Sequence, residues 1–125
     1  MGNELYVIQH IVALRNCSKM NLPINESLVA FDLILFIAIN YLERKEITIK
    51  ELFSNLPYSY TAVRQHYNRL LINGYITHKA HKNDRRVKYL EPTNKLINSV
   101  LNYANDAQRI LSPPPPPIIG VSLTS

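Results

Sequence analysis

The sequence predicts a mainly α-helical domain that carries a small β-hairpin, which places it in the α+β class. An almost continuous apolar run from Leu28 to Leu42 has the length of a buried helix. An amphipathic helix follows over residues 59–74, and two short stretches of alternating apolar and polar residues come directly after it. With 125 residues and 46% hydrophobic content, the chain can build one domain with extensions at its ends.

The first predicted helix spans residues 4–15, where Leu5, Ile8 and Ile11 recur at helical spacing. This apolar face packs either on its own chain or on a second copy, and the sequence leaves both open. A break at residues 21–25, with Pro23 at its centre, ends the segment. We therefore divide the chain into an N-terminal helix or arm at 1–25, a main domain at 26–111 and a proline-rich tail at 112–125.

The second predicted helix, Leu28 to Leu42, is apolar on nearly all sides, so we expect it to be buried at the centre of the fold. Asn25 or Ser27 can cap its start. Its fifteen residues are too few to cross a bilayer, which needs about 20.

A short helix is predicted after Thr48, because Thr48 and Glu51 have the spacing of a capping box. The residues around Ile47 are expected to form a small first strand. Asn55 to Tyr58 then form the turn of a helix-turn-helix.

The next helix has one apolar stripe that contains Val63, Tyr67 and Leu70, and Ser59 can cap its first turn. Gly74 suits the left-handed turn that ends a helix. The opposite, polar side carries donors and acceptors, as a helix in the DNA major groove requires. The predicted base-reading and phosphate-binding residues are Ser59, Tyr60, Thr61, Arg64, Gln65 and Asn68. His66 is expected at the surface.

Two predicted strands, 76–80 and 87–91, flank a polar turn at 81–86. A two-stranded hairpin with a cationic tip directly after such a helix is the wing of a winged helix-turn-helix. The wing residues predicted to contact the DNA backbone or minor groove are Lys79, Lys82, Asn83, Arg85, Arg86 and Lys88.

The residues from 52 to 95 resemble the MarR family of transcriptional regulators. Asn-Gly-Tyr-Ile at 73–76 is similar to that family's Lys-Gly-Leu-Ile junction, and Asp84-Arg85-Arg86 followed by Thr93 is similar to its Asp-x-Arg wing and Leu-Thr. The resemblance implies that Asp84 holds a wing arginine in an ion pair, and that helices from both termini form a homodimer. It allows a small-molecule effector, which the residues themselves do not indicate.

The last predicted helix covers residues 94–111, with Thr93 as its cap. Apolar residues recur along it at spacings of three and four, as in a dimer seam. The predicted dimer residues are Leu5, Ile8, Ile11, Ile97, Val100, Ala104, Ala107 and Leu111. The alternative is that the two terminal helices pack on each other within one chain. Five prolines, Pro113 to Pro117, follow and predict a tail without a core.

Basic charge is concentrated where the DNA contact is predicted. Residues 59–95 hold eight Lys or Arg against two Asp or Glu, a net of +6, whereas the chain as a whole carries +5. Such a cluster is typical of phosphate binding, and double-stranded DNA is therefore the predicted partner.

Enzyme chemistry is not indicated, because the sequence has no phosphate-binding glycine loop, nucleophile motif or metal-ligand spacing. We predict no cofactor, no metal and no membrane segment. The single cysteine fits a reducing compartment, so a cytoplasmic, nucleoid-associated location is expected. The alternative function is a protein-binding winged helix within a larger assembly. DNA binding needs Arg64 and Arg86 exposed and unpaired, whereas a protein-binding module could bury them.

Overall fold

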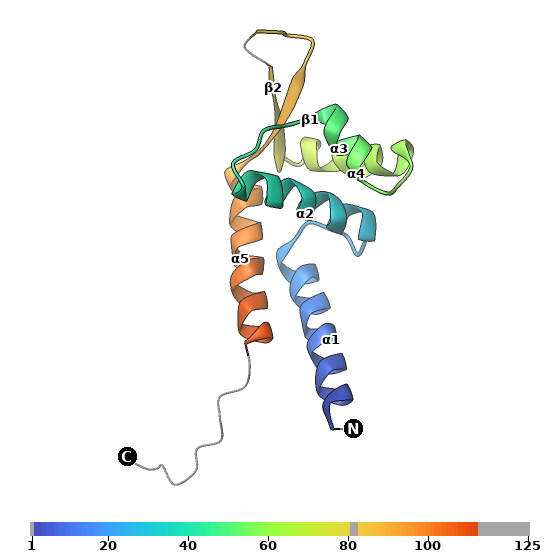
Figure 1. Ribbon diagram of the computed structural model, residues 1–125, viewed down its shortest axis with the longest axis vertical. Coiled ribbons are helices and arrows are strands. Elements are labelled where there is room, and N and C mark those ends of the chain that lie inside the picture. Colours follow the sequence, from blue (N-terminus) through green and yellow to red (C-terminus); the bar gives the residue numbers. More distant parts are fainter. Residues whose placement is uncertain (1, 81–82, 113–125) are drawn as a thin grey trace, which may run out of the picture.

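The computed structural model describes residues 2–80 and 83–112. The predicted class is confirmed: within these residues, five helices accompany a small antiparallel sheet. In Figure 1, α2 lies across the molecule, with α1 and α5 on one side and α3, α4 and the hairpin on the other. The elements are α1 (Asn3–Asn21), α2 (Leu28–Leu42), β1 (Ile47–Thr48), α3 (Ile49–Asn55), α4 (Tyr60–Ile72), β2 (Ile76–Ala80), β3 (Lys88–Pro92) and α5 (Asn94–Leu111).

The central helix α2 has the predicted bounds, and the Ser27 hydroxyl caps it by accepting from the Ala30 amide at 3.2 Å. Leu33, Ile34 and Ile37 are fully buried in one core that also includes side chains from α3, α4, α5, the three strands and the loop after α1. Full burial of each such side chain stabilises the fold by about 1.5–3 kcal/mol. The helix is not covered on all sides, however, because residues at both of its ends, such as Leu42, are exposed.

The sheet has strand order β1-β3-β2, with Leu90 of β3 facing Ile47 on one side and His78 on the other. The predicted first strand at Ile47 is thus confirmed, and the second wing strand begins one residue later than predicted. Only the base of the hairpin is buried, by Ile76 and Leu90, so its outer half stands in solvent.

Most predicted caps are confirmed. Thr48 accepts from the Glu51 amide at 3.0 Å, and Ser59 accepts from the Ala62 amide at 3.2 Å. Thr93 occupies the predicted N-cap position of α5, but the expected capping hydrogen bond from its side chain is not formed. Its hydroxyl donates instead to the carbonyls of Gly74, at 2.7 Å, and Tyr75, at 3.0 Å. These two carbonyls lie where α4 gives way to β2 and the helical hydrogen bonds have ended.

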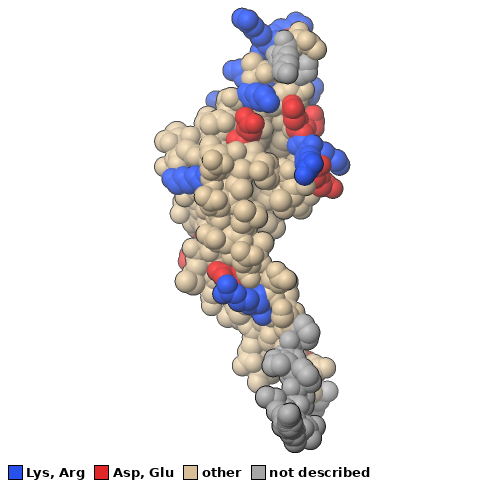
Figure 2. All heavy atoms as spheres, turned by 90° about the vertical axis from the view of Figure 1, so that its left-hand side faces the viewer, with Lys and Arg blue, Asp and Glu red and all other residues tan. Residues whose placement is uncertain are grey.

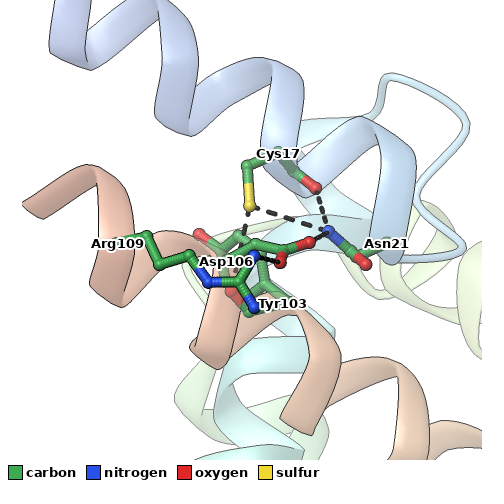
Figure 3. Close-up of polar contacts among 5 residues, drawn as sticks. All are labelled: Cys17, Asn21, Tyr103, Asp106 and Arg109. Carbon is green, nitrogen blue, oxygen red and sulfur yellow. Dashed lines mark hydrogen bonds and ion pairs between the residues drawn. The ribbon is translucent and has the colours of Figure 1, made fainter.

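The first helix is six residues longer than predicted at its C-terminal end, because that end packs against α5 (Figure 3). The Asn21 side-chain amide donates to the Asp106 carboxylate at 3.1 Å and to the Cys17 carbonyl at 3.0 Å. The buried Cys17 thiol lies 3.8 Å from the Tyr103 carbonyl, and Arg109 pairs with Asp106 at 3.5 Å. Contacts far along the chain therefore fix the last turn and a half of α1.

The N-terminal half of α1 is exposed, with Leu5 at 69% and Ile8 at 56% of their full accessibility. The terminal helices thus pack on each other within one chain over only part of their length. Among the predicted dimer residues of α5, Val100 packs against the chain's own core, whereas Leu111 is exposed. Ile97 and Ala107 are half-buried, Ala104 is exposed, and Ile11 is exposed on α1.

Candidate nucleic-acid interface

Helix α4 presents a polar face to solvent. Its inner side is fixed by the burial of Val63, Tyr67 and Leu70. Because the helix repeats every 3.6 residues, Arg64, Gln65 and Asn68 between them project outward. All six predicted contact residues lie in or at the start of this exposed face: Ser59, Tyr60, Thr61, Arg64, Gln65 and Asn68.

One contact on this face was not anticipated from the sequence. The Arg64 guanidinium donates to the Tyr60 hydroxyl at 3.1 Å and lies 5.8 Å from the centre of the Tyr60 ring. That ring in turn packs on Phe53 of α3, with 4.9 Å between ring centres. Tyr60 therefore holds Arg64 against the helix-turn-helix. The spacing of four residues between the two side chains was the available signal.

The wing places its predicted contact residues in solvent. Lys79, Asn83, Arg85, Arg86 and Lys88 are exposed, and Lys82 lies outside the described residues. Figure 2 shows Lys and Arg side chains gathered over this end of the molecule.

Asp84 pairs with Arg86, the second of the two wing arginines. Arg86 Nε lies 3.1 Å from Asp84 Oδ1 and its Nη2 lies 3.4 Å from Oδ2, while its backbone amide donates to Oδ1 at 3.0 Å. The Arg86 side chain is 91% exposed, so the pair adds at most about 1 kcal/mol to stability and acts by orienting the guanidinium. Arg64 and Arg86 are both exposed. Arg64 is hydrogen-bonded to a neutral hydroxyl and has no ion-pair partner among the described residues, whereas the expectation that Arg86 would be unpaired is wrong.

Three side-chain hydrogen bonds connect α4 and its preceding turn to the rest of the fold. The Tyr58 hydroxyl donates to the Asp32 carboxylate on α2, which raises the pKa of Tyr58. The Tyr67 hydroxyl and His78 Nε2 share a hydrogen bond between α4 and the wing, with the two rings stacked at 5.7 Å. Burial raises the pKa of Tyr67 to about 12.

The third connection corrects the expected surface position of His66. The imidazole is half-buried, with Nε2 3.1 Å from the Ser27 hydroxyl that caps α2. Nδ1 is buried and has no hydrogen-bond partner among the described residues. Burial lowers the pKa of His66, and the nearby Arg69 charge lowers it further. The packing of α4 on α2 therefore favours the neutral imidazole.

Nothing in the described part of the chain gathers three or more His, Cys, Asp or Glu side chains into a possible metal site. None of its described helices combines the length and the apolar character needed to cross a bilayer.

Comparison with solved structures places this geometry in a known fold. The transcriptional regulator Tm0710 from Thermotoga maritima is 19% identical with a TM-score of 0.64, covering 85% of this chain and 70% of that one. The heme sensor protein PefR from Streptococcus agalactiae, in complex with heme, is 21% identical with a TM-score of 0.57, covering 88% and 77%. MarR is 17% identical with a TM-score of 0.54, covering 89% and 81%.

The chain has the MarR-type winged-helix fold. No protein-family model matches its sequence, and no curated protein matches it. At these identities the likeness is one of fold, so the function has to be argued from the surface of this chain.

Proposed function

We propose that the chain is a DNA-binding transcriptional regulator of the MarR type. In the proposed complex, α4 lies in the major groove and the wing lies on the backbone or in the minor groove. The observation that carries the proposal is the exposed polar face of α4 directly beside a cationic hairpin, within a segment of net charge +6. The fold shared with three regulators, or sensors, of this type supports the same conclusion.

The two parts of the surface have different tasks. Gln65 and Asn68 carry amides, which can donate to and accept from one base edge, and Arg64 can make paired contacts to guanine. Arg85 and Arg86 carry charge at the hairpin tip, where they meet phosphates or the degenerate minor groove. Sequence preference therefore comes from α4, and most of the non-specific affinity comes from the wing.

We also propose that the protein acts as a homodimer through α1 and α5. Leu5, Ile8 and Leu111 are large apolar side chains that remain exposed in one copy, and a second copy would remove them from water. Two copies related by a two-fold axis would read two half-sites one turn of DNA apart, about 34 Å.

The test is the salt dependence of binding by the whole chain to a DNA site selected from random sequence. If each protomer meets about four to six phosphates, the slope of log K against log salt is roughly −4 to −5 per protomer. Affinity that stays constant between low and moderate salt would contradict the proposal.

The alternative, a protein-binding module within a larger assembly, is favoured by one observation. The exposed apolar half of α1 also suits a different protein as its partner. A chain that remains monomeric and binds no DNA, but keeps its fold, would favour this alternative.

A further inference from the structure

A cleft of about 320 Å³ lies at the flank of α4, where three segments meet. The loop between α1 and α2 contributes Pro23 and Asn25, the end of α4 contributes Arg69 and the adjoining Asn73, and α5 contributes Lys95 from its first turn. We call it the flank cleft. It is separate from the exposed reading face of α4, although Arg69 follows Asn68 of that face directly.

Two positive charges line the flank cleft, and none of the described Asp or Glu residues does. Arg69 is half-buried, and its guanidinium has neither a carboxylate nor a hydrogen-bond partner among the described residues. Lys95 donates to the Asn73 carbonyl at 3.0 Å, and its ammonium lies 4.3 Å from the centre of the Tyr75 ring, a cation–π contact. It has no carboxylate partner among the described residues.

Some basic side chains elsewhere in the fold, such as Lys19 and Lys45, pair with carboxylates. Lys19 lies 3.0 Å from Glu26, and Lys45 lies 3.6 Å from Glu43. Arg86 and Arg109 also pair with carboxylates two or three residues away. Arg69, which is half-buried, and Lys95, which is exposed, line a common cleft without a carboxylate partner among the described residues. A partly buried charge such as that of Arg69 is costly when it is left unpaired.

The start of α5 adds to the positive character of the flank cleft. Thr93 turns its hydroxyl toward Gly74 and Tyr75, so no side chain caps the first amides of this 18-residue helix. Uncapped amides and the helix dipole favour an anion at this end. Lys95, in the same first turn, lines the cleft.

We propose that the flank cleft is an oxyanion site, which binds a phosphate or carboxylate group between Arg69 and Lys95. A guanidinium offers paired donors to two oxygens of such a group, and the ammonium adds a point charge. The anion can come from a small molecule or, because Arg69 borders the reading face, from the DNA backbone. When bound, it would link the end of α4 to the start of α5 and to the loop before α2.

The first experiment titrates the whole chain, without DNA, with inorganic phosphate at constant ionic strength, and follows backbone amide chemical shifts. We expect saturable shifts at Asn25, Arg69, Asn73 and Lys95. The double variant Arg69→Gln with Lys95→Gln should weaken phosphate binding at least about tenfold, because it removes two charge-assisted interactions. The matched control, Lys45→Gln with Arg109→Gln, makes the same charge change elsewhere and should bind phosphate as the wild type does.

Folding is checked by thermal unfolding in chloride, because Lys95 also contacts Asn73 and Tyr75. Arg69→Gln alone removes a guanidinium without partners and should keep the fold, and Lys95→Arg keeps the charge and should keep phosphate binding. Shifts that do not saturate, or equal affinity in the double variant and its control, would overturn the proposal.

The second experiment identifies the source of the anion by repeating the titration with DNA bound. If phosphate still binds to the complex with similar affinity, the site takes a small molecule. If phosphate and DNA compete, and the double variant loses DNA affinity while its control does not, the site takes a backbone phosphate. Because the first experiment contains no DNA, its result is independent of the proposed regulator function.

Discussion

Tyr60 determines how Arg64 is presented on α4. Its ring packs on Phe53, and its hydroxyl accepts from the guanidinium at 3.1 Å. An arginine held in this way loses less side-chain entropy when it binds a base than a free arginine does. If Arg64 reads a base as proposed, the contact with Tyr60 should contribute to that recognition.

Tyr60→Phe should weaken binding to the selected DNA site by about 1 kcal/mol, roughly fivefold in Kd. The ring contact with Phe53 remains, and only the acceptor for Arg64 is lost. Fluorescence anisotropy on selected and random DNA measures the change, which should be larger on the selected site. Tyr41→Phe, at an exposed position on α2, is the control. An equal loss on both DNAs would show that Tyr60 does not position a base contact.

His66 should make the stability of the fold depend on pH. Because burial lowers its folded-state pKa below the ordinary value of 6.5, the unfolded chain takes up its proton first as the pH falls. The contribution of neutral His66 to the free energy of unfolding is thus complete above about pH 6.5 and is lost as the pH falls toward the folded-state pKa. The free energy of unfolding, measured in urea at pH 7.5 and 5.5, should drop more in the wild type than in His66→Gln. Identical drops would contradict this assignment.

The junction between α4 and β2 depends on the backbone of Gly74. Its φ of +77° is left-handed, and an added Cβ would meet no atom within 4 Å, so any cost of a side chain there comes from the backbone. Lys95 and Thr93 donate to carbonyls of the same junction. The orientation of the wing relative to α4 therefore rests on this turn and on the contact between Tyr67 and His78.

Gly74→Ala should lower the free energy of unfolding by about 1–2 kcal/mol, the cost of placing an L-residue in this conformation. Thermal or urea unfolding measures it. Gly2→Ala is the matched control, because Gly2 has a φ of −69° and open space around it. If Gly74→Ala lowers the free energy of unfolding no more than Gly2→Ala does, the backbone at the junction adjusts to the side chain without strain.

The wing and α4 should respond differently to substitution. Arg85→Ala with Arg86→Ala should weaken binding to all DNA sequences by similar factors and reduce the salt slope by up to about 1.8, since each lost phosphate contact removes about 0.9. Gln65→Ala or Asn68→Ala should instead cost about 1–3 kcal/mol on the selected site alone. If the wing variant loses sequence preference and the α4 variants keep it, the assignment of base recognition to α4 is wrong.

The two terminal helices form the end of the molecule opposite the hairpin (Figure 1). Their contact within one chain is polar around Asn21 and Asp106, whereas the first half of α1 keeps apolar side chains in water. The apolar side chains in the first half of α1 are therefore not used for packing within one chain. They remain available to a second copy, so a dimer can form without disturbing the fold of either copy.

Ile8→Glu should convert the proposed dimer to a folded monomer, because a charge without a partner in an apolar interface costs several kcal/mol. Sedimentation equilibrium measures the mass, and circular dichroism checks the fold. Met20→Glu, at an 87% exposed position on the same helix, is the control and should keep the wild-type mass. Val100 is unsuitable for this test, since it packs on the chain's own core. An unchanged mass for Ile8→Glu would exclude this interface.

The elements specified by short-range signals could be predicted from the sequence. The bounds of α2, the caps at Thr48 and Ser59 and the turn at Gly74 follow from periodicity and from hydrogen bonds within a few residues. The exposed face of α4 follows as well, since the burial of Val63, Tyr67 and Leu70 fixes the opposite side.

Only the tertiary structure decided the features that join distant segments. The last turns of α1 are held by a hydrogen bond to α5. The Thr93 hydroxyl donates to the α4–β2 junction and does not cap its own helix. His66 is hydrogen-bonded to Ser27, which caps α2. Arg69 and Lys95, 26 positions apart in the sequence, meet in one cleft. A residue's periodicity shows which side of its own helix it occupies, but its partner across the fold depends on how the helices pack, and local sequence does not encode that.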